Sequence, residues 1–196
     1  MNNIFITGTD TDIGKTIASA WICKNSNAKY WKPIQTGNDL DADVISHFSP
    51  KTLIIPNTYK LKAPLSPYDS GKIENKQVDV KKIFEQAPKN NTVIEGAGGA
   101  LVPISENILM ADLINPCNAK ALIVAKSKLG FLNHIFMTIE VLKSRSIEIL
   151  GIVLNGKTDL ISTIETFSKH KVLAVLNDLE SISTIELPSE IKEELK

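Results

Sequence analysis

The stretch between Gly8 and Thr16 limits most strongly what this chain can fold into. An apolar run, Ile4-Phe5-Ile6, leads into the turn Thr7-Gly8-Thr9-Asp10-Thr11-Asp12-Ile13-Gly14-Lys15-Thr16, and a helical pattern follows from Ile17 to Cys23. Where such a turn opens a helix, backbone N–H groups and the positive end of the helix dipole converge on a point that suits an anion. The order of elements predicts a phosphate-binding loop, in which Lys15 reaches the terminal phosphates and the Thr16 hydroxyl ligates Mg²⁺.

The spacing within this loop is a variant. The common motif has four residues between its glycines, whereas five separate Gly8 from Gly14. The alternative is an ordinary strand-to-helix turn with a capping Asp or Thr and a surface lysine. The strand before the loop and the helix after it favour phosphate binding.

The composition is that of a globular chain without charge bias. Its 196 residues are 43% hydrophobic, so we expect a single domain over residues 1–196, with a tail from about residue 178 whose role is undefined. Basic and acidic residues number 22 each, which gives no indication of a nucleic-acid or membrane partner. No apolar stretch approaches the roughly 20 residues of a membrane span and no leader-like segment is evident, so a cytoplasmic protein is expected.

Strand-like and helix-like patterns alternate along the chain. The fully apolar runs 121–125 and 149–155 are typical of buried parallel strands, whereas apolar residues recur at helical spacing in 79–87 and 131–143. We expect further strands near 29–34, 53–55, 91–95 and 172–175, and further helices after the loop that follows residue 35 and near 160–169. The alternation predicts an α/β fold with a single doubly wound, mainly parallel sheet flanked by helices, as in P-loop NTPases.

A second informative stretch is Asn91 to Ala100, where a strand ends in Glu95 before a glycine-rich segment. Ligands of doubly wound sheets bind at the carboxyl ends of the strands. Lys15, Lys32, Glu95, Gly130 and Asn155 all fall at such ends, which predicts one cleft. Glu95 is then a candidate Mg²⁺ ligand, directly or through water, and the alternative is an acid at a turn.

Four segments occur together and in a fixed order in one known family. They are the loop Thr7–Thr16 with its Gly8-to-Lys15 spacing, Lys32-Pro33-Ile34-Gln35-Thr36-Gly37, Glu95-Gly96-Ala97-Gly98-Gly99 and Leu129-Gly130-Phe131-Leu132-Asn133-His134. In these segments, and over roughly residues 3–177, the chain resembles the dethiobiotin synthetases. These ligases of biotin biosynthesis close a cyclic urea on 7,8-diaminopelargonate with ATP and CO₂.

The resemblance implies a nucleotide site and a metal site. Residues Asp12, Ile13, Gly14, Lys15, Thr16 and Ile17 would hold the ATP phosphates, and Glu95, Gly96, Ala97, Gly98, Asn155 and Leu176 would complete the nucleotide site. Mg²⁺ would be held by Thr16, Glu95 and one acid of the pair Asp41 and Asp43. Asp43 is favoured because it precedes the apolar Val44-Ile45, as the family's acid does.

The resemblance also implies a diamine site shared across a homodimer. Lys15 and Lys32 would be catalytic, and Thr11 and Thr36 would contact the diamine. The helix opening Gly130-Phe131-Leu132-Asn133 would take the substrate carboxylate from across the interface. Without the resemblance, Lys32 would be interpreted as a solvated lysine and Thr36 as a turn hydroxyl, and His134 remains an ordinary polar residue of the first helical turn.

The implied mechanism needs no nucleophilic side chain. An amine captures CO₂ as a carbamate, the carbamate oxygen attacks the γ-phosphate to give a carbamic–phosphoric anhydride, and the second amine closes the ring with loss of phosphate. Two lysines with one or two Mg²⁺ ions meet the need of phosphoryl transfer for positioning and charge neutralisation.

The chain departs from the family where the base would be read, at Asn155-Gly156 and Val175-Leu176-Asn177. Another nucleoside triphosphate is therefore an alternative to ATP. One rival function is a partition or positioning ATPase switch. Those proteins carry a second lysine five residues before the main one, and here that position is Asp10. Another rival is a nucleotide-binding regulatory module without turnover, which would not need Lys32 and Thr36 in its cleft.

Overall fold

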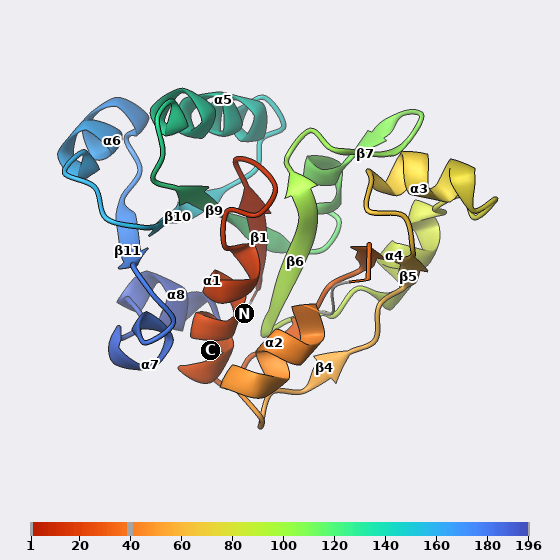
Figure 1. Cartoon of the computed structure of the whole chain (residues 1–196), viewed down its shortest axis with the longest axis horizontal. Coiled ribbons are helices and arrows are strands. Elements are labelled where there is room, and N and C mark those ends of the chain that lie inside the picture. The colour runs from red at the N-terminus through yellow and green to blue at the C-terminus, as the bar shows by residue number, and fades with distance from the viewer. Residues whose placement is uncertain (1, 39–40, 196) are drawn as a thin grey trace.

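Seven parallel strands form the central sheet, in the order β11-β10-β9-β1-β6-β2-β4 (Figure 1). The computed structural model describes residues 2–38 and 41–195. The predicted α/β sheet with helices on its faces is confirmed. The strands of this sheet are β1 (Asn3–Gly8), β2 (Lys29–Trp31), β4 (Ile54–Ile55), β6 (Thr92–Gly99), β9 (Ala119–Lys126), β10 (Ile149–Asn155) and β11 (Val172–Leu176).

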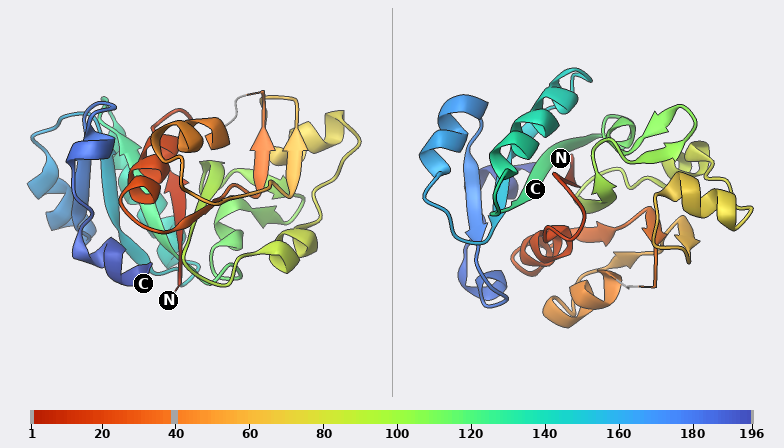
Figure 2. Two further views of the ribbon diagram at one scale, coloured as in Figure 1. Left: turned by 90° about the horizontal axis from the view of Figure 1, so that it is seen from below. Right: turned by 45° about the horizontal axis from the view of Figure 1, so that its top comes forward.

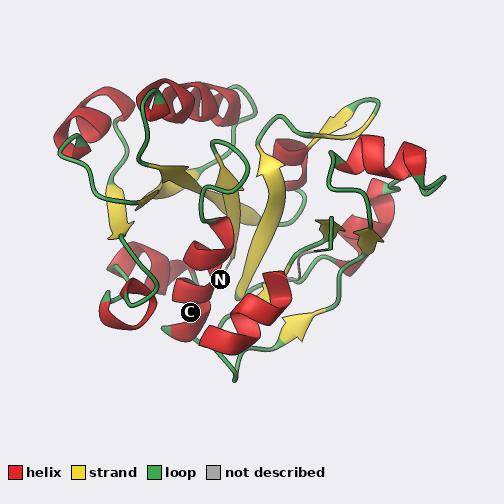
Figure 3. Ribbon diagram, in the orientation of Figure 1, coloured by secondary structure: helices red, strands yellow, loops and turns green. Residues whose placement is uncertain are grey.

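Helices cover both faces of the sheet, and the strands are apolar on both sides for that reason (Figure 3). One face carries α1 (Lys15–Lys24), α2 (Asp41–Phe48), α7 (Ser181–Thr184) and α8 (Ser189–Glu194). The other carries α4 (Val80–Gln86), α5 (Phe131–Lys143), α6 (Ile161–Ser168) and the 3-10 helix η1 (Met110–Leu113). In β1, Ile4 and Ile6 pack toward α1, whereas Phe5 packs toward α5.

Pro33 divides the predicted strand 29–34 into two. β2 ends at Trp31, and β3 (Ile34–Thr36) leaves the main sheet to pair with β5 (Tyr59–Leu61). Proline has no N–H to donate to a sheet, so the chain changes partners at this residue. Lys32 consequently lies at the junction between the two sheets.

Three further elements differ from the sequence-based expectation. β6 continues through the glycines to Gly99 instead of ending at Glu95. The proline-containing segment before residue 67 leads into α3 (Pro67–Ile73), with the Ser66 side chain capping its first turn. A small antiparallel pair, β7 (Pro103–Ser105) and β8 (Ile108–Leu109), follows β6.

The C-terminal tail packs against the first helix and meets the N-terminus. Trp21 Nε1 donates to the Ile185 carbonyl at 2.8 Å, and Asn25 Nδ2 donates to the Ile182 carbonyl at 2.9 Å. Asn2 Nδ2 donates to Glu194 at 2.6 Å, so the two ends of the chain lie side by side (Figure 2). None of the helices in the described ranges has the length and apolar character needed to cross a membrane.

Candidate active site

The phosphate loop joins β1 to α1 and is held by a distant strand. Gly14 has φ 98°, a conformation that favours glycine, and a Cβ at this position would also displace the Asn155 amide, whose Nδ2 would lie 2.4 Å away. That Asn155 amide, at the end of β10, donates to the Ile13 carbonyl at 3.1 Å. The loop conformation therefore depends on the β10 end as well as on its own sequence.

Lys15 lies folded into this loop. Its Nζ donates to the Asp10 carbonyl at 3.0 Å, and the residue is 7% exposed. Burial lowers the pKa of Lys15, and the nearby Glu95 carboxylate opposes that shift. The ammonium group is thus directed across the loop, where a bound phosphate would lie.

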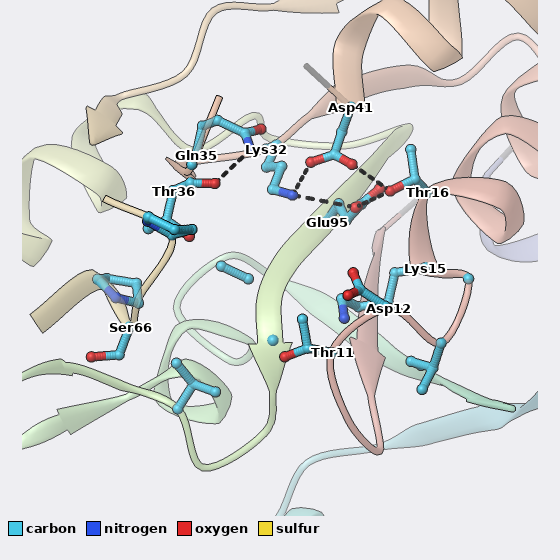
Figure 4. Close-up of a pocket in the computed structure, with 18 of the residues that line it drawn as sticks. Thr11, Asp12, Lys15, Thr16, Lys32, Gln35, Thr36, Asp41, Ser66 and Glu95 are labelled. Atoms are coloured by element: carbon cyan, nitrogen blue, oxygen red, sulfur yellow. Dashed lines mark hydrogen bonds and ion pairs between the residues drawn. The ribbon is translucent and has the colours of Figure 1, made fainter. Parts of the chain in front are cut away.

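A cluster of oppositely charged side chains lies beside the loop. Thr16 Oγ1 is 2.6 Å from Oδ1 of Asp41 and 2.9 Å from Oε1 of Glu95. Lys32 Nζ hydrogen-bonds Oδ2 of Asp41 and lies 3.5 Å from Oε1 of Glu95 (Figure 4). These residues come from α1, α2, β6 and the junction after β2, so the fold assembles the cluster from distant segments.

Charge pairing outweighs burial in this cluster. Burial alone would lower the pKa of Lys32, but the Glu95 and Asp41 carboxylates raise it above its ordinary value. Burial would raise the pKa of Asp41, but Lys32 and the Thr16 hydroxyl bring it below its ordinary value. Both groups therefore remain charged at neutral pH.

A cavity of about 830 Å³ opens onto the loop and the cluster. This volume is at the upper end for small-molecule sites, which reach about 1,000 Å³. Figure 4 shows Lys32, Glu95, Thr16 and Thr11 around it. The predicted site residues that line it are Thr11, Asp12, Ile13, Gly14, Lys15, Thr16, Ile17, Lys32, Thr36, Glu95, Ala97, Gly98 and Asn155.

Three predicted nucleotide or metal residues do not line this cavity. Asp43 is exposed on α2 and outside the cavity, whereas Asp41, the other acid of the predicted pair, lies in the cluster beside Thr16. Gly96 is buried beneath the site, where a Cβ would lie 2.9 Å from Phe5 Cε1. Leu176 is 1% exposed, and its carbonyl accepts from the Gly156 N–H at 2.9 Å.

The predicted carboxylate site at Gly130-Phe131-Leu132-Asn133 lies at the start of α5, outside the main cavity. Lys128, just before it, pairs with Asp10 of the phosphate loop at 2.9 Å. His134 lines a neighbouring cavity of about 400 Å³ together with Gly8, Asp10 and Leu101. The opening of α5 is thus next to the outer side of the loop.

Sequence reasoning did not identify several residues of this region. Gln35, Pro64, Leu65 and Ser66 line the cavity, and Ser19 and Tyr30 contact Glu95 from below. The spacing of Ser19, three residues after Thr16, was a signal for a shared helix face. Residues 64–66 follow β5, whose pairing with β3 brings them to the cavity. The sequence did not indicate this pairing, because Pro33 interrupts the strand pattern.

The oxygens of this cluster suit a magnesium ion. The Thr16 hydroxyl has one proton and can donate it to only one of the two carboxylates that contact its oxygen. The oxygens of Thr16, Asp41 and Glu95 therefore converge with lone pairs that are free to bind a metal ion. Mg²⁺ is commonly bound by one or two carboxylates together with substrate phosphates. Thr16, Asp41 and Glu95, next to the phosphate loop, fit that pattern.

The parallel sheet, the loop with Lys15 and Thr16, and the acid at the neighbouring strand define a P-loop nucleotide-binding protein. A ParA family ATPase from Chlorobium tepidum shares this fold at TM-score 0.58 and 11% identity, covering 99% of this chain and 90% of the other. The MinD cell division protein from Aquifex aeolicus has the same fold at TM-score 0.56 and 13% identity, covering 93% of this chain and 85% of the MinD chain. A family profile described as an AAA domain matches residues 2–186.

Other proteins are more similar to this chain in sequence than the ParA family ATPase and MinD are. The ATP-dependent dethiobiotin synthetase of Paramagnetospirillum magneticum is 40% identical over 93% of this chain and 91% of its own length. The Lawsonia intracellularis enzyme is 38% identical over 96% of this chain and 97% of its own length. The Campylobacter jejuni enzyme is 40% identical over 87% of this chain and 85% of its own length. The chain belongs to the ATP-dependent dethiobiotin synthetase family, as the four sequence segments predicted.

Proposed function

We propose that this protein is an ATP- and Mg²⁺-dependent cyclo-ligase that converts 7,8-diaminopelargonate and CO₂ into dethiobiotin. Family membership supports the activity. The observation that carries the proposal for this chain is that Lys15, Lys32, Thr16, Asp41 and Glu95 meet at one cavity.

Lys15 and Lys32 neutralise charge at two different points of the reaction. Lys15 emerges from the phosphate loop and would contact the terminal phosphates of ATP. Lys32 stands at the junction of the two sheets, beside Glu95 and Thr16, where its ammonium would neutralise charge on the carbamate and the transferring phosphoryl group. Positioning and charge neutralisation of this kind are the main protein contributions to phosphoryl transfer.

Thr16, Asp41 and Glu95 would hold Mg²⁺. The bound ion would neutralise charge on the β- and γ-phosphate oxygens. Thr11 of the loop and Thr36 at the end of β3 lie on different sides of the cavity, where they would contact the diamine. Gln35 and Ser66 lie beside Thr36 and join the same wall.

A homodimer would complete the diamine site. Around the start of α5 and the segment after β6, large apolar side chains are exposed: Leu129 fully, Leu101 to 52% and Met137 to 50%. They are next to Gly130-Phe131-Leu132-Asn133, whose helix N-terminus would receive the substrate carboxylate of the other subunit. Light scattering at working concentration tests this arrangement, because a monomer that retains full turnover would contradict it.

The activity is tested by incubating the protein with diaminopelargonate, bicarbonate, Mg²⁺ and ATP, with detection of dethiobiotin by mass spectrometry. Product is expected, and folded protein without product would contradict the proposal. The same experiment separates the enzyme from an ATPase switch, whose ATP hydrolysis would not depend on the diamine. Repeating it with other nucleoside triphosphates measures the base preference.

A further inference from the structure

The two oxygens of Glu95 have different surroundings. Oε1 faces the cluster, 2.9 Å from Thr16 Oγ1 and 3.5 Å from Lys32 Nζ. Oε2 faces away from it, 2.7 Å from Ser19 Oγ and 3.1 Å from Tyr30 Oη. The mechanism assigns no role to these last two hydroxyl groups.

The fold explains why both hydroxyls reach the same oxygen. Tyr30 on β2 is opposite Val93 on β6, and Glu95 lies two residues further along the same face. Tyr30 and Glu95 are therefore diagonal neighbours on the sheet face that α1 covers. Ser19 lies one helical turn after Thr16 in α1, so both helix hydroxyls point down onto Glu95.

Both hydroxyls are donors that remain protonated and shielded from water. Ser19 is fully buried and Tyr30 is 1% exposed. An alcohol and a phenol are ordinarily protonated at neutral pH, so each hydroxyl can donate to the carboxylate. Ser19 Oγ is also 3.0 Å from the Lys15 carbonyl, but the shorter contact and the charged acceptor favour the carboxylate.

We propose that Tyr30 and Ser19 are positioning residues of the magnesium site. By holding Oε2 of Glu95 they turn Oε1 toward Thr16 and Asp41, and they prevent the carboxylate from rotating about its last bond. This inference rests on the metal role of Glu95 proposed above. Neighbours that orient a metal ligand in this manner affect metal affinity although they do not touch the ion.

The test compares two hydroxyl deletions with two matched controls in the full chain. Tyr30→Phe and Ser19→Ala remove only the groups in question. Tyr59→Phe removes a hydroxyl that instead accepts from the Asp79 N–H at 3.0 Å, and Ser168→Ala removes a buried one that donates to the His170 carbonyl at 3.2 Å. Neither control residue lines the cavity.

The probe is Mn²⁺ in the presence of ATP and without diamine, followed by electron paramagnetic resonance. Tyr30→Phe and Ser19→Ala are each expected to weaken Mn²⁺ binding by about tenfold, the lower end for such neighbours. The half-saturating Mg²⁺ concentration for turnover should rise by a similar factor, with the KM for the diamine changed less than twofold. The two control variants should match the wild type in both measurements.

Mn²⁺ binding by Tyr30→Phe and Ser19→Ala within twofold of the wild type would overturn the inference, even if both variants were less stable. An equal loss in Tyr59→Phe would overturn it too, because it would show a general effect of hydroxyl removal. A wild type that binds Mn²⁺ with ATP but forms no dethiobiotin would reject the proposed activity and leave this inference intact if the variant pattern holds.

Discussion

Two lysine–carboxylate pairs flank the phosphate loop, and they differ in their access to water. Lys32 pairs with Asp41 and Glu95, with side chains exposed to 9%, 18% and 1%. Lys128 pairs with Asp10 at 2.9 Å, with side chains exposed to 49% and 48%. The same chemical groups are therefore expected to have very different effects on stability and on the reaction.

The difference follows from the solvent. Loss of one member of a buried pair leaves a charge without water or a partner, which typically costs about 3–5 kcal/mol. Exposed pairs contribute about 0.2–1 kcal/mol, because water solvates each partner when the other is lost. The inner group, Lys32 with Asp41 and Glu95, lines the cavity, whereas the outer pair, Lys128 with Asp10, joins the loop to the turn before α5.

Replacing Lys32 should have the largest effect. Lys32→Met is expected to lower turnover by about 100-fold or more, because a charge at the reacting centre is lost. It should also lower the free energy of unfolding by about 3 kcal/mol, since Asp41 and Glu95 lose their cation. Dethiobiotin formation and urea unfolding measure the two effects. The control is Lys60→Met on β5, which is exposed, and turnover of Lys32→Met within threefold of the wild type would contradict the assignment.

Replacing Asp41 and replacing Asp43 should have clearly different effects on the Mg²⁺ dependence of turnover. Asp41→Asn is expected to raise the half-saturating Mg²⁺ concentration by about tenfold or more, because an amide oxygen lacks the charge that offsets the cation. Asp43→Asn should have no effect, since this side chain is exposed and outside the cavity. Turnover measured against free Mg²⁺ gives both values, and the reverse order would support Asp43 as the ligand.

Acid should weaken the ion pair between Lys32 and Asp41 below about pH 4. The pKa of Asp41 in the folded protein is lower than its ordinary value of 3.8, so its pairing stabilises the fold above that pH. This contribution is lost as the pH falls through the lowered pKa. The difference in unfolding free energy between the wild type and Asp41→Asn should be constant from pH 5 to about 8 and shrink in acid. A difference that disappears near neutral pH would be inconsistent with this explanation.

The outer pair should give the smallest effect. Asp10→Asn and Lys128→Met are each expected to change the unfolding free energy by less than about 1 kcal/mol, with the change reduced further by salt. A double-mutant cycle in urea at low and high NaCl measures the coupling directly. Coupling above about 2 kcal/mol would mean that the exposed pair is far stronger than its solvent access implies.

The sequence predicted the fold and most of the cleft, because strong local signals were enough. The apolar runs of β1, β9 and β10 and the spacing in α5 predicted those elements within a few residues. The branch at Pro33 was missed because a proline can end a strand or pass the chain to another partner, and only tertiary pairing decides which.

The position of each acid relative to the cluster depends on the direction in which its side chain leaves the helix. Asp41 and Asp43 are two residues apart on α2, about 200° around the helix, so one faces the cluster and the other faces water. Nothing local in the sequence specifies that rotation. The contact between Tyr30 and Glu95 was not predicted either, because it depends on the register between β2 and β6.

The contact between Asn155 and the phosphate loop has a consequence for the order of folding. The loop is complete by residue 16, but the amide that holds the Ile13 carbonyl comes from a strand 142 residues later in the chain. During synthesis the N-terminal half would leave the ribosome before that support exists. Nucleotide affinity should therefore reach its full value only when β10 has joined the sheet, which makes ATP binding a reporter of that step of folding.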